Sequence, residues 1–170
     1  RGEESCAREV DRRIVMRSIR PLIVGEAPAR IGDRRHPIAG RCGRKLARLG
    51  GLSFDAFLGS FARVNVLSSW PGAGEIKGTT FPIRAARIAA VRLRRRFVGG
   101  RTVILLGRRV AAAFDLKGDY FAPMRLGRAI VVIVPHPSGV NRWYNDGAHR
   151  RRMGRFVRAV LKRGHRGRTR

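Results

Sequence analysis

Acidic residues are scarce in this chain. Its 170 residues include 11 Asp and Glu against 38 Lys and Arg, which gives a net charge of +27 at pH 7. Four of the 38 are lysines, at positions 45, 77, 117 and 162, so the other 34 are arginines. Codon bias in a GC-rich genome would explain part of the preference for arginine, but not the shortage of acids. Because neutralised phosphates release counterions and arginine binds phosphate oxygens in pairs, this balance predicts a nucleic-acid partner.

Cysteine is almost absent. Cys6 and Cys42 are far apart and form no Cys-x-x-Cys pair, which argues against a structural zinc site or an iron–sulfur cluster. We therefore expect no metal and no cofactor. Two free thiols in a reducing compartment such as the cytoplasm are the expected state, although one disulfide is compatible with the count.

Long apolar runs are missing as well. No stretch approaches the roughly 18 apolar residues that a membrane span needs, and the N-terminal segment is too charged for a secretory signal. Apolar residues still make up 44% of the chain, which argues against wholesale disorder. We expect a monomer with one domain over residues 1–162, followed by a basic disordered tail over 163–170.

Short apolar runs alternate with helical patterns along the chain. Four runs predict buried strands, at 21–25, 61–67, 102–106 and 129–134. Helices are predicted over 3–18, 41–49, 82–97 and 107–114, and a last helix starts after a cap at Asn145 or Asp146. Apolar stripes mark the core faces of the two long helices: Ile83, Ala86, Ala90, Leu93 and Phe97, and Met153, Phe156, Val157, Val160 and Leu161. The alternation predicts a single three-layer αβα domain of the α/β class, with a central, mostly parallel four-stranded sheet.

Distinctive segments follow three of the predicted strands. Gly-Glu-Ala-Pro occupies 25–28, Asn65 lies near the end of the second strand, and His-Pro-Ser-Gly occupies 136–139. Ligands of parallel sheets bind at the carboxyl ends of the strands. The predicted fold would therefore bring these segments together, although they are far apart in the sequence.

Five segments, taken in order, resemble the uracil-DNA glycosylase superfamily. They are GEAP at 25–28, HPIAGRCGRKL at 36–46, VNVL at 64–67, VILLG at 103–107 and HPSGVNRW at 136–143. The match covers roughly residues 20 to 160 and is most similar to bacterial and phage members with GEAPG and HPS motifs. This resemblance implies a monofunctional DNA glycosylase of base excision repair, acting on uracil or a related modified pyrimidine flipped out of DNA. It also implies a protein associated with the bacterial nucleoid, although a nucleus or organelle is not excluded.

The sequence departs from the superfamily pattern in two ways. Many GEAPG-type relatives bind an iron–sulfur cluster through four cysteines, and this chain has only two. The best-known members carry Gly-Gln-Asp-Pro, whose Asp orients the attacking water. Ala27 stands at that position here, which leaves the water-activating residue open.

The resemblance implies catalytic roles for three residues. His136, constrained by Pro137, would donate a hydrogen bond to the pyrimidine O2 as negative charge builds on the leaving base. Glu26 would position water, or only buttress its loop. Asp33 is a further carboxylate in the same loop.

Four residues are expected to contact the base. The amide of Asn65 offers a donor and an acceptor for the O4 and N3 edge of uracil, although an Asn in a loop often bonds only to local backbone. Ala27 lies beside the base, and Ile38 stands where relatives carry a stacking Phe. Ala29 stands where strict uracil enzymes carry a bulky residue that excludes the 5-methyl group of thymine.

The segment after His136 is expected to grip DNA. Ser138, Gly139, Asn141 and Arg142 would bind phosphates, and Arg34 and Arg35 would do so from the GEAP loop. Val140, Arg142 or Trp143 would fill the gap left by the flipped base, while ordinary packing is an equal alternative for Trp143. Trp70 would stack on a base or anchor its loop.

Two other functions remain open. The first is a glycosylase-fold protein that has lost catalysis and binds DNA or RNA, for instance within a ribonucleoprotein. The second is an unrelated α/β enzyme acting on nucleotides, but the chain has no Gly-x-x-x-x-Gly-Lys-Ser/Thr loop to support a nucleotide-hydrolysing version.

Overall fold

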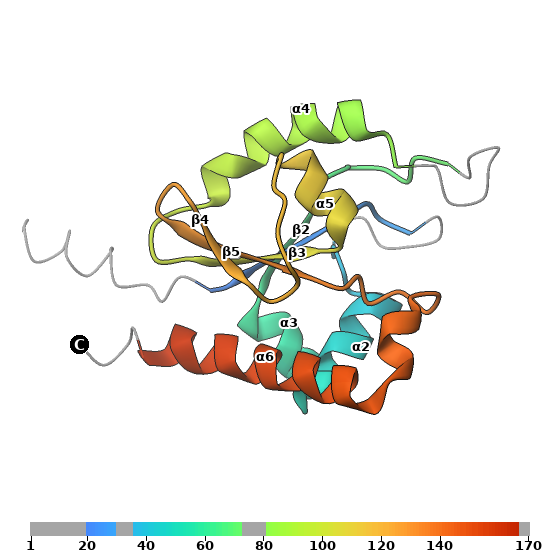
Figure 1. The fold of residues 1–170 in the computed structure, drawn as a ribbon, viewed down its shortest axis with the longest axis vertical. Coiled ribbons are helices and arrows are strands. Elements are labelled where there is room, and N and C mark those ends of the chain that lie inside the picture. The colour runs from blue at the N-terminus through green and yellow to red at the C-terminus, as the bar shows by residue number, and fades with distance from the viewer. Residues whose placement is uncertain (1–19, 30–35, 73–80, 167–170) are drawn as a thin grey trace, which may run out of the picture.

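The structure is a computed structural model that describes residues 20–29, 36–72 and 81–166 (Figure 1). At its centre is one five-stranded sheet with the order β2 (Ala62–Asn65), β1 (Leu22–Gly25), β3 (Thr102–Leu106), β5 (Ala129–Val134) and β4 (Pro123–Leu126). Strands β2, β1, β3 and β5 run parallel, and β4 pairs antiparallel with β5. The predicted α/β class and mostly parallel sheet are confirmed, but the prediction of four strands is wrong.

The additional strand, β4, lies between the predicted helix over 107–114 and the predicted strand at 129–134, where the sequence predicted no helix or strand. Pro123 starts the strand and Gly127 follows it directly, and both residue types normally interrupt strands. Proline is tolerated here because an edge strand needs hydrogen bonds to a neighbour on one side only. Gly127, with a φ of 58°, makes the tight turn that leads into β5.

Helices cover both faces of the sheet (Figure 1). Helices α4 (Ile83–Leu93) and α5 (Arg108–Ala113) pack on one face, and α2 (Arg41–Gly50), α3 (Phe54–Ser60) and α6 (Gly147–Arg166) pack on the other. Successive strand residues alternate between the faces, so Val103 of β3 joins the core beneath α4 while Ile104 joins the core beneath α6. Burial on both faces explains why the central strands read as unbroken apolar runs.

The apolar stripes of the long helices face these cores as predicted. Ala86, Ala90 and Phe97 are buried on one side of the sheet, and Met153, Val157 and Val160 on the other. Asp146 caps α6, because its Oδ1 accepts a hydrogen bond from the backbone N–H of Ala148 at 2.6 Å. Since α6 continues to Arg166, residues 163–166 of the predicted tail are helical. The predicted helix over 3–18 and residues 167–170 lie outside the described residues.

Helix α3 was not predicted from the sequence. It has 7 residues, too few for a periodic apolar pattern, and it is stabilised locally by Ser53, whose hydroxyl accepts from the Ala56 N–H at 3.1 Å. Within the described ranges, none of the helices combines the length and apolar character that crossing a bilayer requires.

Candidate active site

Each of the four parallel strands is followed by, or ends in, a polar residue at the same edge of the sheet. Across the sheet these are Asn65 at the end of β2, Glu26 after β1, Arg109 in the first turn of α5 after β3, and His136 after β5. All four line one pocket of about 790 Å³, a size typical of small-molecule sites. The sheet topology thus brings together an amide, a carboxyl, a guanidinium and an imidazole.

Most residues predicted to act on a base line this pocket. The predicted catalytic residues His136 and Glu26 do so, and so do the four predicted base-binding residues Asn65, Ala27, Ile38 and Ala29. Ala29 is exposed at the pocket. The predicted catalytic residue Asp33 and the predicted DNA-binding residues Arg34 and Arg35 lie outside the described residues.

His136 is held as a neutral imidazole in one tautomer. The backbone N–H of Ser138 donates to its Nδ1 at 3.2 Å, so the ring proton resides on Nε2. Burial lowers the pKa of His136, and the positive charge of Arg109 lowers it further. Gly107 allows the close approach of the β3 end to this ring, because a Cβ there would lie 3.1 Å from the Cβ of His136. The imidazole therefore offers one fixed N–H donor, at Nε2.

Among the described residues that line the pocket, Glu26 supplies the carboxyl group. Burial raises the pKa of Glu26, whereas the positive charge of Arg109 lowers it. The backbone of Glu26 is held by the segment that follows β2, since its carbonyl accepts a hydrogen bond from the Leu67 N–H at 2.9 Å. Arg109 thus favours the ionised form of Glu26 and the neutral form of His136 together. In the described part of the chain, no three His, Cys, Asp or Glu side chains gather as a metal site would need.

Asn65 lies directly against the backbone of Gly25, its partner in the sheet register. A Cβ at Gly25 would lie 2.6 Å from Oδ1 of Asn65 and 3.2 Å from Cγ1 of Ile38. Glycine at the first position of the GEAP segment therefore allows the amide and the Ile38 side chain to meet at the pocket. The amide supplies both a donor and an acceptor for the polar edge of a ligand.

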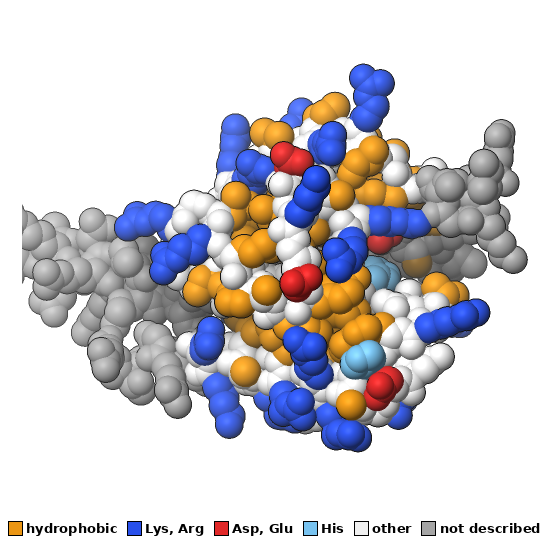
Figure 2. All heavy atoms as spheres, viewed as in Figure 1, with side chains coloured by type: hydrophobic (Ala, Val, Ile, Leu, Met, Phe, Trp, Pro, Cys, Tyr) orange, Lys and Arg blue, Asp and Glu red, His pale blue; other side chains and the backbone are white. Residues whose placement is uncertain are grey.

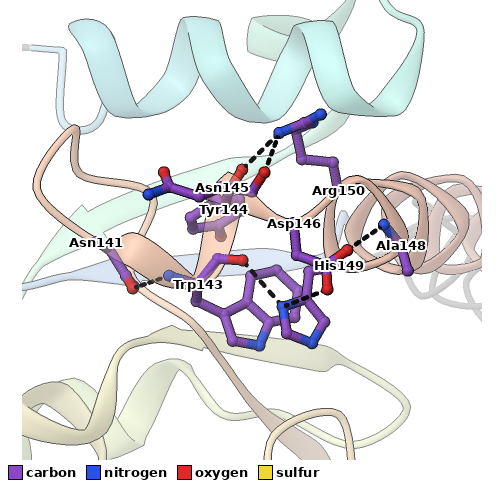
Figure 3. A network of polar contacts seen from close by, with 8 residues as sticks. All are labelled: Asn141, Trp143, Tyr144, Asn145, Asp146, Ala148, His149 and Arg150. Carbon is purple, nitrogen blue, oxygen red and sulfur yellow. Dashed lines mark hydrogen bonds and ion pairs between the residues drawn. The ribbon is translucent and has the colours of Figure 1, made fainter.

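The segment after His136 is held in place by its own hydrogen bonds. Nδ2 of Asn141 donates to the carbonyl of His136 at 2.8 Å. Oδ1 of Asn141 accepts from the N–H of Trp143 at 3.1 Å (Figure 3). Asn141, predicted to bind DNA, therefore shapes the loop that carries His136. The other predicted DNA-binding residues of this segment are Ser138, Gly139, Arg142 and Trp143. Of these, Gly139 and Arg142 are exposed.

Trp143 packs within the protein rather than extending from its surface. Its ring stacks on His149, with centroids 4.4 Å apart and an angle of 3° between the planes (Figure 3). The centroid of the Phe121 ring lies 5.7 Å from that of Trp143. This packing favours the structural interpretation of Trp143. Val140, by contrast, is 90% exposed, so its side chain extends from the surface as the predicted gap-filling role requires.

Sequence reasoning missed several residues that line the pocket, among them Cys42, Phe81 and Arg109. Arg109 was inconspicuous among the many arginines, although its place shortly after a buried strand resembles the signal that marked Glu26 and His136. Phe81 and Trp70 bring aromatic rings to the pocket, where Ile38 offers none. Burial raises the pKa of the Cys42 thiol, which disfavours the reactive thiolate.

No model of a known protein family matches the chain, and no curated protein does so either.

Proposed function

We propose that this protein is a monofunctional DNA glycosylase that removes uracil, or a related modified pyrimidine, during base excision repair. The observation that carries the proposal is the single pocket shared by Glu26, Asn65 and His136. These groups supply a water-binding carboxylate, a base-reading amide and a hydrogen-bond donor for the leaving base. The resemblance of the GEAP and HPSG segments to the uracil-DNA glycosylase superfamily supports the same activity.

His136 would stabilise the leaving base. When the bond between C1′ of the sugar and N1 of the base breaks, its electron pair moves into the base, which leaves as an anion with charge on O2. The Nε2–H of His136 donates to this oxygen as the charge develops. The bond from Ser138 to Nδ1 fixes the donor before the reaction, so no reorganisation is needed at the transition state.

Glu26 would activate the attacking water by accepting its proton. After the base departs, water attacks the electron-poor C1′, and a carboxylate nearby can accept the proton that the water loses. The charge of Arg109 opposes the effect of burial and helps to keep Glu26 ionised for this task. Because Ala27 supplies no second carboxylate at the position used by the best-known superfamily members, we expect a slow enzyme that depends on leaving-group stabilisation.

The walls of the pocket suit a pyrimidine with a substituent at C5. Asn65 would pair with the O4 and N3 edge of the base, and Trp70 or Phe81 would cover its face. Ala29 offers no bulk against a 5-substituent. We therefore expect 5-hydroxymethyluracil to be accepted, and 5-fluorouracil, which leaves more readily as an anion, to be excised faster than uracil.

Nucleic-acid binding without catalysis is the alternative function. The absence of a carboxylate at Ala27 and the net charge of +27 favour it. Such a protein would use the pocket to hold an unpaired base of DNA or RNA, and the sugar–base bond would stay intact.

One assay separates these two functions. The protein is incubated with single- and double-stranded oligonucleotides that contain one uracil, and abasic sites are then cleaved with alkali. An oligonucleotide with cytosine at the same position and the His136→Ala variant serve as controls. Strand cleavage that depends on both uracil and His136 supports the glycosylase. Tight binding with no abasic sites, even at protein excess and long incubation, would overturn it in favour of the binding protein.

A further inference from the structure

A second hollow lies between α2 and α6, away from the pocket residues. It has a volume of about 540 Å³ and is lined by five arginines: Arg48, Arg150, Arg151, Arg155 and Arg158. Leu49 and Gly154 complete its described lining, so no acidic side chain of the described residues lines it. Figure 2 shows basic side chains along the lower edge of the molecule, over α6. We call this hollow the arginine groove.

Close packing of the two helices forms the floor of the arginine groove. A Cβ at Gly154 would collide with the backbone carbonyl oxygen of Leu49, and a Cβ at Gly50 would lie 2.7 Å from Cγ1 of Val157. Glycine at both positions therefore lets α2 and α6 approach closely. The arginines of the groove stand on two rigid helices rather than on loops, which fixes their spacing.

Two of the arginines are tied to backbone carbonyls. Nη1 of Arg150 donates to the carbonyls of Tyr144 at 2.9 Å and of Asn145 at 2.8 Å (Figure 3). Nη1 of Arg158 reaches the carbonyl of Gly50 at 3.5 Å. These bonds keep the two guanidinium groups at the groove. Arg151 and Arg155 are exposed between them along α6.

Lys45 connects the arginine groove to the candidate active site. Its Nζ donates to the carbonyl of Ser138 at 3.4 Å and lies 4.0 Å from the ring centroid of Tyr144. Burial lowers the pKa of Lys45, and the charges of Arg48 and Arg150 lower it further, although Cys42 raises it. Lys45 and Arg48 are three residues apart on α2 and therefore lie on the same side of that helix, so positive charge continues from the HPSG segment into the groove.

The length of the groove matches a short stretch of nucleic-acid backbone. Arg150 and Arg158 are eight residues apart on α6, which corresponds to about 12 Å along a helix. A DNA strand advances about 3.4 Å per nucleotide, so this distance spans about three to four phosphates. Arginine side chains are well suited to such oxygens because their guanidinium groups bind them in pairs.

From these observations we propose that the arginine groove binds the phosphate backbone of DNA a few nucleotides from the base held in the pocket. The identity of the ligand as DNA rests on the proposed function. The assignment of the groove as a phosphate-binding site rests on the convergence of five guanidinium groups and on the link through Lys45. Five positive charges gathered in this way favour a polyanion, because each phosphate that they neutralise releases counterions condensed on the nucleic acid.

The test compares two double variants with equal loss of charge. Arg151→Gln with Arg155→Gln alters the groove without removing the arginines that bond to backbone. Arg84→Gln with Arg87→Gln is the matched control, because both residues are exposed on α4, across the sheet from α6. Thermal unfolding of each variant verifies that the fold is retained. Affinity for an undamaged 20-base-pair duplex is then measured between about 50 and 200 mM salt, where phosphate contacts dominate the salt dependence.

Each lost phosphate contact lowers the slope of log K against log salt by about 0.9. We expect the groove variant to lose nearly twice that amount and to bind more weakly than the control at low salt. Equal slopes for the two variants would overturn the groove proposal, whether or not the protein excises bases. Conversely, a groove-specific loss of slope in a protein that excises nothing would keep the groove and overturn the glycosylase.

Discussion

The pocket and the arginine groove use polar side chains in opposite ways. The pocket holds a few partly buried groups, each placed by the end of a different parallel strand, and burial shifts the pKa values of Glu26 and His136. The groove presents five exposed charges on two helices. Few, fixed and desolvated groups suit the stabilisation of a transition state, whereas many exposed charges suit the neutralisation of a polyanion. The difference predicts that catalysis and affinity can be changed separately.

The largest expected effect is on excision in His136→Ala. Removal of one preorganised donor to a developing anion costs about 10²–10³ in rate, or roughly 2.7–4 kcal/mol. Single-turnover excision of uracil from an oligonucleotide measures this loss, and binding to undamaged duplex is the control that should stay unchanged. An unaltered excision rate would exclude His136 from the mechanism.

The next largest effect is a loss of folding stability in Gly154→Ala, a residue that does not line the pocket. The new methyl group must displace the Leu49 carbonyl at the base of the groove, and overpacking of this kind costs about 1–3 kcal/mol of unfolding free energy. Gly59→Ala is the matched control, because a Cβ at this helical position meets nothing within 4 Å. Chemical denaturation of both variants should show a loss of stability for the first only. Similar midpoints would mean that the two helices are less tightly packed than described.

A change in substrate range is expected for Ala29→Tyr. The added ring would fill the space beside C5 of the base, so 5-hydroxymethyluracil should be excluded while uracil is retained. A pocket that differs by one small group discriminates by roughly 10–200-fold. Single-turnover rates on uracil, 5-fluorouracil and 5-hydroxymethyluracil in one oligonucleotide measure the effect. If the unaltered protein already rejects the hydroxymethyl base, some other residue closes the pocket.

The smallest expected effect is a shift of pH dependence in Arg109→Gln. Without this charge the pKa of Glu26 rises further, and the pKa of His136 also rises because one of the two causes that lower it is gone. Both changes reduce the fraction of protein with Glu26 ionised and His136 neutral as the pH falls. The acidic limb of the rate profile should therefore move to higher pH. Arg108→Gln removes the same charge from a neighbour outside the pocket lining, and an equal shift in that variant would contradict a local role for Arg109.

Much of this architecture could be predicted from the sequence because the core strands are strongly patterned. The predicted strands at 102–106 and 129–134 match β3 and β5 residue for residue. Strand β4 was not predicted from the sequence because Pro and Gly lie in and beside it. Pairing with β5, rather than its own composition, stabilises this strand. Glu26, Asn65 and His136 could be placed together because the ends of parallel strands meet at one edge of a sheet. The arginine groove could not be predicted, since nothing in the sequence shows that Gly154 packs against Leu49.

The backbone conformation of Ile38 could not be predicted from the sequence either. Ile38 has a φ of 61°, in the left-handed region that branched side chains avoid. Hydrogen bonds hold the backbone on either side of it: Arg63 Nε donates to the Pro37 carbonyl at 3.2 Å, and the Ala39 N–H donates to that of His36 at 3.2 Å. Such strain costs about 1–3 kcal/mol. Laboratory evolution for thermal stability alone should therefore favour glycine at this position. The more stable protein would lack the Ile38 side chain that lines the pocket.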